Sequence, residues 1–476
     1  MTLAMNWEEW ANHDGLALAD RVRKGDVTAA ELAAQAKAAI EMTNPALSAV
    51  VEVFDDAVAD PKQNGTNLDG VFAGVPYLMK DLGPTLKGRL QEFGSMLMQG
   101  HRPTEDSFLT GKIRQAGLNI MGRSTTPEFG VCSAAENALY VTRNPWNLDY
   151  TTNGSSAGTA AAVAAGVLPL SHATDGGGSI RIPASYCGLV GLKPTRYRTP
   201  SGPGKYEGWF GASVGNVVSR NMRDMALFMD VGQGHEAGSP YWAKPLVRPY
   251  VEELRTAPGR LRIGVVRDSL TGSPLDPAVV RVLDDTAKRL AAQGHEVEEL
   301  RLSIDPRQLF GAHGSVVGDA LLTMVHDREQ VLGRSATADD YERITQVVLG
   351  NAQKVTGEGL YRARQSFESI GGYMEEQFQK YDVILSPVTA NITPDLGLLS
   401  LNQPWDSYAH NAMGSAAFTV LANVSGQPAL SLPVGMSDNG LPIGMMFTAP
   451  LGGEDVLLRL GAQIEQDRPF AKLPVV

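Results

Sequence analysis

Apolar residues recur at two spacings along the chain, and each spacing predicts a different kind of element. From Thr28 to Ile40 they lie three or four positions apart, behind a Thr-x-x-Glu sequence that has the form of a helix capping box. We expect residues 1–60 to be mainly helical and to pack around the edge of a core, with the helix ending at Pro45.

Short apolar blocks alternate with helical patterns between residues 70 and 231. The helical pattern of 106–115, for example, is followed by a strand-like block at 118–121. Residues 154–166 resemble a tight turn entering a helix of small residues, which we expect to be buried because it has no polar face. Residues 180–192 are apolar and strand-forming. This alternation favours an α/β sheet between layers of helices.

The C-terminal half continues the alternation. Strand patterns at 260–267 and 295–302 flank a helical pattern at 279–293, and the three predict a βαβ unit. Later segments return the chain to the sheet and add a final helix: 415–433, 441–451 and 454–466. No segment has the composition of a linker, so we expect one domain over residues 1–476.

The composition argues against several classes of protein. The 476 residues carry a net charge of −11, whereas nucleic-acid-binding surfaces are usually basic. No apolar stretch approaches the roughly 18–20 residues that span a bilayer, and the first residues lack the pattern of a signal peptide. Two cysteines, Cys132 and Cys187, do not suggest a disulfide framework. We expect a soluble cytoplasmic protein that binds neither nucleic acid nor membranes.

Three consecutive glycines, Gly176, Gly177 and Gly178, stand directly before Ser179. Glycine runs are most often flexible connectors, but this one leads into the apolar block 180–192, so the turn enters a core. Residues without Cβ let backbone N–H groups converge on one point, where they can stabilise an oxyanion. The pattern indicates a serine nucleophile beside an oxyanion-binding turn.

Two further features carry candidate chemistry. Ser155 and Ser156 stand at the start of the small-residue helix, where capping explains one serine more readily than two. Lys80 directly follows the apolar run 75–79, which would bury its side chain, although most lysines are solvated. Burial disfavours the ammonium form, and bringing its pKa close to neutrality costs about 4 kcal/mol, within the range of known buried lysines.

Lys80, the Ser155–Ser156 pair and the sequence G-G-S-I-R-I-P at 177–183 resemble the amidase signature family, whose members hydrolyse amides with a Ser-cisSer-Lys triad. Other similar stretches extend the resemblance over nearly the whole chain: 134–148, 187–195 and 381–389. The resemblance implies an α/β/α sandwich around a central mixed β-sheet. Residues 70–231 would then form the core that carries the triad, and residues 232–476 would complete the sheet and the pocket.

The resemblance also implies roles for individual residues. Ser179 is the nucleophile that forms an acyl-enzyme, Ser155 follows a cis peptide bond and relays the proton, and Lys80 is the terminal base. The oxyanion hole would consist of backbone N–H groups, those of Gly176, Gly177 and Gly178, with that of Ser179 as a further candidate. Three residues would hold the surrounding loops: Ser156, Asp175 and Arg181.

The chain departs from the family pattern in three places: at Asn153 and Ala157, which replace glycines, and at Gly176. Gly176 stands where threonine is common, and we hypothesise that its missing side chain leaves room for the acyl or leaving group. Ile182 stands where glutaminase subunits of tRNA amidotransferases usually carry glutamine, which argues against that activity, the alternative within the family. A catalytically silent ligand-binding or scaffold protein is the alternative from another class.

The sequence gives fewer indications of which residues line the substrate pocket. Tyr206, Trp209 and Phe210 lie in the Gly- and Pro-rich segment 200–215, where they either line the pocket or pack within the loop. We expect neutral aryl or alkyl amides as substrates, with carbamates (urethanes), anilides and esters left open. We read His172 as a strand-end or core histidine and not as a catalytic one. No metal- or nucleotide-binding sequence occurs, so no cofactor or metal is implied, and a homodimer remains open.

Overall fold

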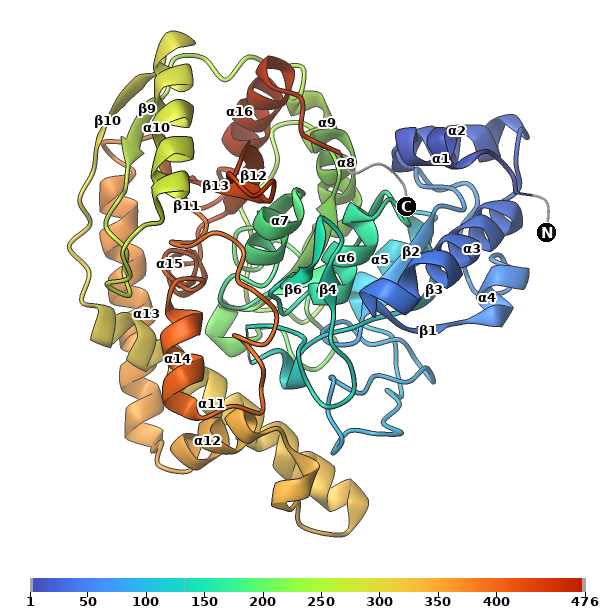
Figure 1. Ribbon diagram of the computed structural model, residues 1–476, viewed down its shortest axis with the longest axis horizontal. Coiled ribbons are helices and arrows are strands. Elements are labelled where there is room, and N and C mark those ends of the chain that lie inside the picture. Colours follow the sequence, from blue (N-terminus) through green and yellow to red (C-terminus); the bar gives the residue numbers. More distant parts are fainter. Residues whose placement is uncertain (1–2, 132, 473–476) are drawn as a thin grey trace.

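One sheet of eight strands runs through the computed structural model, which describes residues 3–131 and 133–472. Figure 1 shows strands of this sheet in the middle of the molecule. The strands lie in this order: β10 (Glu296–Glu299), β9 (Arg262–Val265), β11 (Val383–Pro387), β13 (Pro442–Thr448), β12 (Ala429–Met436), β7 (Val190–Lys193), β8 (Val214–Ser219) and β6 (Leu170–Asp175). β9 pairs in parallel with β10 and β11, and the other neighbours pair antiparallel. The sheet is therefore mixed, as expected.

Helices connect the strands and flank them. In chain order they are α1 (Trp7–Asn12), α2 (Gly15–Lys24), α3 (Ala29–Leu47), α4 (Asp55–Ala59), α5 (Phe108–Gln115), α6 (Ala157–Ala164), α7 (Arg181–Cys187), α8 (Met222–Gly232), α9 (Tyr250–Glu253), α10 (Pro277–Ala292), α11 (Pro306–Leu332), α12 (Arg343–Ala352), α13 (Gly357–Gln377), α14 (Trp405–Met413), α15 (Val420–Ser425) and α16 (Glu454–Asp467). Short 3₁₀ turns occupy Glu128–Gly130, Trp209–Gly211 and Ala338–Asp340.

Both faces of the eight-stranded sheet are covered. Successive strand residues point to opposite faces, and on β11 Val383 and Leu385 lie in the core shared with α10 and α16. Ile384, between them, lies instead in the core shared with α13 and α15. Helices therefore pack on both sides, which confirms the expected α/β/α sandwich. The proposed division of the chain at residues 60, 70 and 231 stays a prediction.

A second sheet lies beside the first, next to the N-terminal helices shown in blue in Figure 1. Its strands are ordered β1 (Val50–Val53), β3 (Asn119–Ser124) and β2 (Pro76–Lys80), and a separate pair is formed by β4 (Arg143–Asn144) and β5 (Asn147–Thr151). The expectation of one central sheet was therefore incomplete. Lys80 ends a strand of the second sheet and not of the large one.

Two sequence predictions of local structure are wrong. Residues 180–192 were expected to be a strand, but Arg181–Cys187 is helix α7 and only Val190–Lys193 is a strand. Every residue of α7 is buried, so the helix lacks the polar face that would have distinguished it from a strand. Helix α3 also runs past Pro45 to Leu47. Pro45 has no N–H to donate to the preceding turn, yet the helix continues for two more residues, and the N–H of Ser48 still bonds to the carbonyl of Asn44.

Other predicted elements are confirmed. The capping box at Thr28 is present, with the side chains of Thr28 and Glu31 each bonded to the other's backbone N–H. The small-residue helix is α6, which is wholly buried, and the predicted βαβ unit consists of β9, α10 and β10.

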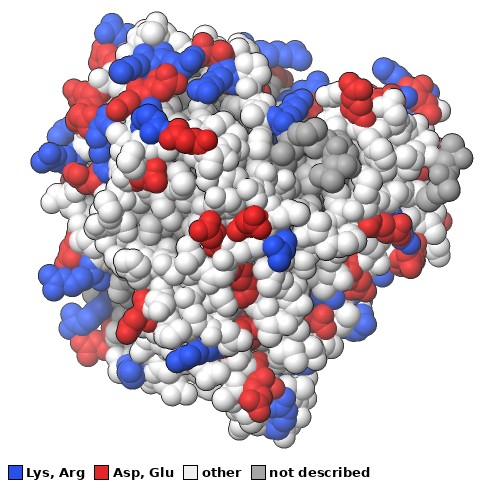
Figure 2. Space-filling model, in the orientation of Figure 1, with Lys and Arg blue, Asp and Glu red and all other residues white. Residues whose placement is uncertain are grey.

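Within the described residues, none of the helices combines the length and hydropathy needed to cross a membrane. Figure 2 shows acidic and basic side chains interspersed on the face it displays, with no broad basic area.

Candidate active site

Side chains, and not a backbone ladder, join the two sheets where β2 meets β6. The Ser171 hydroxyl donates to the carbonyl of Leu78 (2.7 Å) and accepts from its N–H (2.8 Å). The backbone N–H of Lys80 donates to His172 Nδ1 (3.3 Å). Burial lowers the pKa of His172 to about 3, so its ring is neutral. The interpretation of His172 as a core histidine fits this position.

Lys80 is buried at the end of β2, and its amine meets two hydroxyl groups. Nζ lies 2.7 Å from Ser155 Oγ and donates to Thr174 Oγ1 at 2.8 Å. Burial places the pKa of Lys80 well below its usual value, although the negative charge of Asp175 acts in the opposite direction. A neutral amine can give one hydrogen to Thr174 and keep its lone pair for the hydroxyl of Ser155.

The turn that carries Ser155 is tied to its surroundings on both sides. The Gly154–Ser155 peptide bond is cis. Asn153 adopts a left-handed conformation (φ 56°), and its side chain accepts from the N–H of Gly154 and donates to Ser415 Oγ. Ser156 bonds to both the carbonyl and the N–H of Thr174, each at 3.2 Å. Ser156 therefore ties the turn to β6 and makes no capping hydrogen bond to α6.

Asp175 and Arg181 form an ion pair with no exposed surface at the end of β6. Arg181 donates from Nε (2.8 Å) and Nη2 (2.9 Å) to the two carboxylate oxygens, and Asn423 donates to one of them (2.8 Å). Burial alone would raise the pKa of Asp175, but these partners hold it below its usual range. The carboxylate also accepts from the N–H groups of Gly178 and Ile180, so the pair shapes the turn around Ser179.

Ser179 is one of two accessible residues in a long buried stretch. From Thr151 to Thr195 every residue is buried except Gly177 and Ser179, which are partly exposed. Buried backbone N–H groups almost always have acceptors. Among the described residues, however, none accepts from the N–H groups of Gly176, Gly177 or Ser179. These three N–H groups of the Ser179 turn therefore have no acceptor in the described chain.

One of the expected oxyanion donors is not free. The N–H of Gly178 donates to Asp175 Oδ1 (2.8 Å), so Gly178 leaves the expected set of donors, and Gly176, Gly177 and the further candidate Ser179 remain in it. Gly178 has φ 136°, and a Cβ there would lie 2.4 Å from Thr419 Oγ1, so only glycine fits. Within the described part of the chain, no hydrogen bond joins the hydroxyls of Ser155 and Ser179. Proton transfer between them is therefore part of the proposal below.

The space beside Gly176 is filled. A Cβ on Gly176 would lie 2.2 Å from the ring of Trp209, so the extra room hypothesised from the missing threonine side chain does not exist. Trp209 also meets the ring of His313, on α11, edge to face with centroids 6.2 Å apart. This tryptophan therefore forms a wall of the site.

The two other aromatic candidates lie elsewhere. Phe210 packs against Phe367 and beneath the guanidinium of Arg364, and Tyr206 packs against Gly202 and Gly238. These contacts fit the alternative of loop packing for both residues. Of the three aromatic candidates, Trp209 is thus the one that touches the glycine turn.

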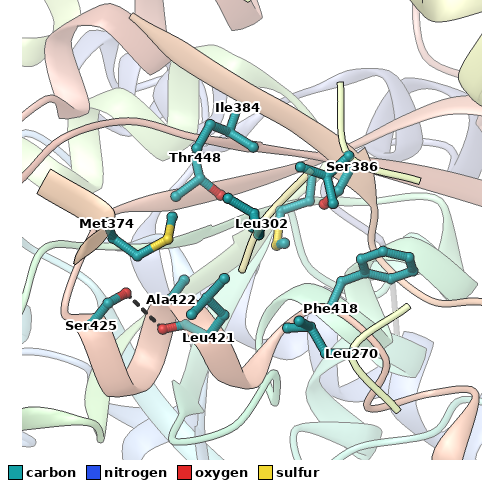
Figure 3. A pocket seen from close by; sticks show the side chains of 12 residues that line it. Leu270, Leu302, Met374, Ile384, Ser386, Phe418, Leu421, Ala422, Ser425 and Thr448 are labelled. Atoms are coloured by element: carbon teal, nitrogen blue, oxygen red, sulfur yellow. Dashed lines mark hydrogen bonds between the residues drawn. The ribbon is translucent and has the colours of Figure 1, made fainter. Parts of the chain in front are cut away.

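Figure 3 shows a cavity between α13, α15 and the strands β11 and β13. Its walls are mainly apolar, and the hydroxyl of Ser425 is turned to the carbonyl of Leu421. Its volume is about 20 Å³, enough for about one water molecule and too small for a substrate.

Sequence reasoning missed four residues that shape the site: Thr174, His313, Thr419 and Asn423. Thr174 could have been suspected, because it precedes Asp175 on the same strand. His313 and Asn423 lie on the distant helices α11 and α15, and Thr419 directly precedes α15. No local sequence pattern marks these three residues.

The comparisons with known proteins agree with this geometry. A model of the amidase family matches residues 31–458. The chain belongs to the amidase family. It is accordingly a hydrolase that acts on carbon–nitrogen bonds of amides.

Relatives of this amidase align over almost their whole length. The 6-aminohexanoate-cyclic-dimer hydrolase of Paenarthrobacter ureafaciens is 35% identical over 472 residues, which cover 96% of this chain and 95% of the relative. The enzyme of the same name from a Pseudomonas strain gives the same values. The solved structure of 6-aminohexanoate cyclic dimer hydrolase complexed with substrate superposes with a TM-score of 0.90 at 34% identity, covering 98% of both chains. The fold and family assignments agree.

Proposed function

We propose that this amidase cleaves neutral aryl or alkyl amides through an acyl-enzyme on Ser179. One observation carries the proposal: Ser179 and Gly177 alone are accessible between Thr151 and Thr195, and the N–H groups beside the Ser179 hydroxyl have no acceptor among the described residues. A nucleophile and oxyanion donors exposed together in a buried region suit attack on a carbonyl group.

In the proposed first step, Ser179 Oγ attacks the carbonyl carbon and gives its proton to Ser155. Ser155 passes its own proton to the neutral amine of Lys80, 2.7 Å away. The C=O π electrons move to the oxygen, which accepts hydrogen bonds from Gly177, Ser179 and Gly176. The tetrahedral intermediate then expels the amine, which takes the proton back from Lys80 through Ser155. Water repeats the sequence and releases the acid.

The proposed substrate class follows from the wall of the site and from the chemistry. Trp209 offers an uncharged aromatic surface next to the glycine turn, which suits a flat or alkyl group. Ser179 needs only an electrophilic carbonyl, so carbamates (urethanes), anilides and esters are candidates with amides. The names of the relatives add the cyclic dimer of 6-aminohexanoate.

The test is a substrate panel combined with intact-protein mass spectrometry. The panel holds 4-nitroanilides, anilides, aryl and alkyl carbamates, esters and 6-aminohexanoate cyclic dimer. We expect turnover of at least one of them and an acyl adduct on Ser179. Ser179→Ala should lose both, whereas Ser335→Ala, at an exposed serine, should keep both. An adduct on another residue, or no turnover at all, would overturn the proposal.

The glutaminase alternative has its own readout. Ile182 is buried against Gly178 and offers no hydrogen bond to a glutamine side chain. Ammonia release from glutamine, with no turnover of the panel, would favour that alternative. A chain that neither turns over a substrate nor reacts at Ser179 would favour the scaffold alternative. A cytoplasmic location and a homodimer remain predictions, and size-exclusion chromatography tests the second.

A further inference from the structure

His313 holds one end of the peptide plane whose other end is the free N–H of Gly177. Its side chain reaches from α11 to the turn after β6, where Nε2 lies 2.7 Å from the carbonyl oxygen of Gly176. A carbonyl only accepts, so Nε2 donates. The peptide between Gly176 and Gly177 is planar and trans, so its N–H points opposite to its C=O. Fixing the carbonyl therefore fixes the direction of the Gly177 N–H.

The neighbouring peptide planes have different supports. The carbonyl of Gly177 accepts from Thr419 Oγ1 (2.6 Å), and the N–H on the same plane donates to Asp175. That plane is thus held at both ends. The Gly176–Gly177 plane is held at its carbonyl end by His313, while no described residue accepts at its N–H end. His313 is therefore the hydrogen-bonding support of this donor within the described chain.

Packing fixes the imidazole ring itself. The ring lies about 3.4 Å from where a Cβ on Gly177 would be, and Trp209 meets it edge to face. Burial lowers the pKa of His313 from its usual value, although the bond to Gly176 and the charge of Asp175 oppose this shift. The ring is accordingly neutral, with its hydrogen on Nε2 and a lone pair on Nδ1.

We propose that His313 is a positioning residue that aims the Gly177 N–H at the developing oxyanion. This inference rests on the proposed role of Ser179. His313 does not touch the reacting atoms and transfers no proton, so its effect is confined to how well one donor is aligned in the transition state. Removing an oxyanion donor costs about 10²–10³ in kcat, and misaligning one should cost less, about 10–100-fold.

The test compares two substitutions at His313 with a matched control on the same helix. His313→Phe keeps an aromatic ring but loses the donor, whereas His313→Gln places an amide N–H near the position of Nε2. His326→Phe makes the same exchange at an exposed site on α11. We expect His313→Phe to lower kcat by about 10–100-fold with KM changed less than about twofold, because the interaction forms only in the transition state. His313→Gln and His326→Phe should stay within about threefold of wild type.

A fluorophosphonate probe separates this inference from the function on which it rests. The phosphonyl oxygen takes the oxyanion position, so labelling of Ser179 should slow in His313→Phe by the same factor as kcat. If the wild type is not labelled on Ser179, the proposed function fails. If the wild type is labelled and His313→Phe is labelled equally fast, the role of His313 fails. A change confined to KM, or equal losses in the Phe and Gln variants at unchanged melting temperature, would also overturn it.

Discussion

Replacing Arg181 with methionine removes the cation that neutralises Asp175. Both side chains have no exposed surface, so water cannot take over the role of the guanidinium. Methionine fills similar space without a charge or a donor. Asp175 loses two charge-assisted hydrogen bonds, of 2.8 and 2.9 Å, and Thr419 loses the donor to its carbonyl.

The expected cost follows from the charge that is left behind. Removing one partner of a buried ion pair typically costs about 3–5 kcal/mol. Asp175 keeps the bonds from Asn423, Gly178 and Ile180, so we expect Arg181→Met to lie at the lower end, about 3 kcal/mol at pH 7. The double variant Asp175→Asn with Arg181→Met removes both charges of the pair. It should recover about 2 kcal/mol of the loss.

The cost should also grow with pH. In the wild type the pKa of Asp175 lies below its unfolded value of about 3.9, so the stabilisation is present above that pH and is lost as the pH falls. In Arg181→Met the dominant effect of burial raises the pKa of Asp175 above the unfolded value. That variant therefore loses stability as the pH rises through the new pKa, and the difference between the proteins widens towards pH 7.

Urea unfolding followed by circular dichroism, at pH 4.5, 5.5 and 7, measures these differences. The reasoning is refuted if the difference between wild type and Arg181→Met is the same at all three pH values. It is equally refuted if the double variant is no more stable than Arg181→Met. Lys37→Met, which removes a partly exposed cation paired with Asp55, is the control and should cost less than about 1 kcal/mol.

Three further predictions address the site. Lys80→Met should lower kcat/KM by at least about 10⁴-fold and leave the melting temperature unchanged or higher. In the wild type, kcat/KM should rise with pH through the pKa of Lys80, because only the neutral amine accepts a proton. Ser156→Ala should cost about 1–2 kcal/mol in urea unfolding, because it leaves the N–H and carbonyl of Thr174 without this partner, whereas Ser335→Ala should cost less than about 0.5 kcal/mol. Gly176→Thr should lose activity because its Cβ would strike Trp209, and adding Trp209→Ala should restore part of it.

Each of these has an outcome that contradicts it. An active Lys80→Met enzyme would remove Lys80 as the base, and so would a kcat/KM that falls where the amine of Lys80 loses its proton. Equal stability of the Ser156 and Ser335 variants would show that the bonds to Thr174 contribute little. A fully active Gly176→Thr single variant would mean that Trp209 moves freely away from the glycine turn.

The residue pattern alone determined the fold class and several elements. Alternating apolar blocks predicted an α/β sheet between layers of helices, and the small-residue helix and the βαβ unit lie where the pattern placed them. The reason is that periodicity records which face of an element is buried. Helix α7 was missed for the same reason, since it is buried on all sides and has no polar face. Local motifs also singled out Lys80, Ser155 and Ser179, whose catalytic roles remain predictions.

The tertiary structure alone decided how these residues meet. Lys80 and Ser155 are 75 positions apart and come into contact because the second sheet packs against β6. His313 and Thr419 reach the glycine turn from 137 and 242 positions away, and they hold the carbonyl groups of Gly176 and Gly177. Trp209 filled the space that the sequence left open beside Gly176. Such contacts depend on how elements pack, and packing distant segments together leaves no periodic trace in the sequence.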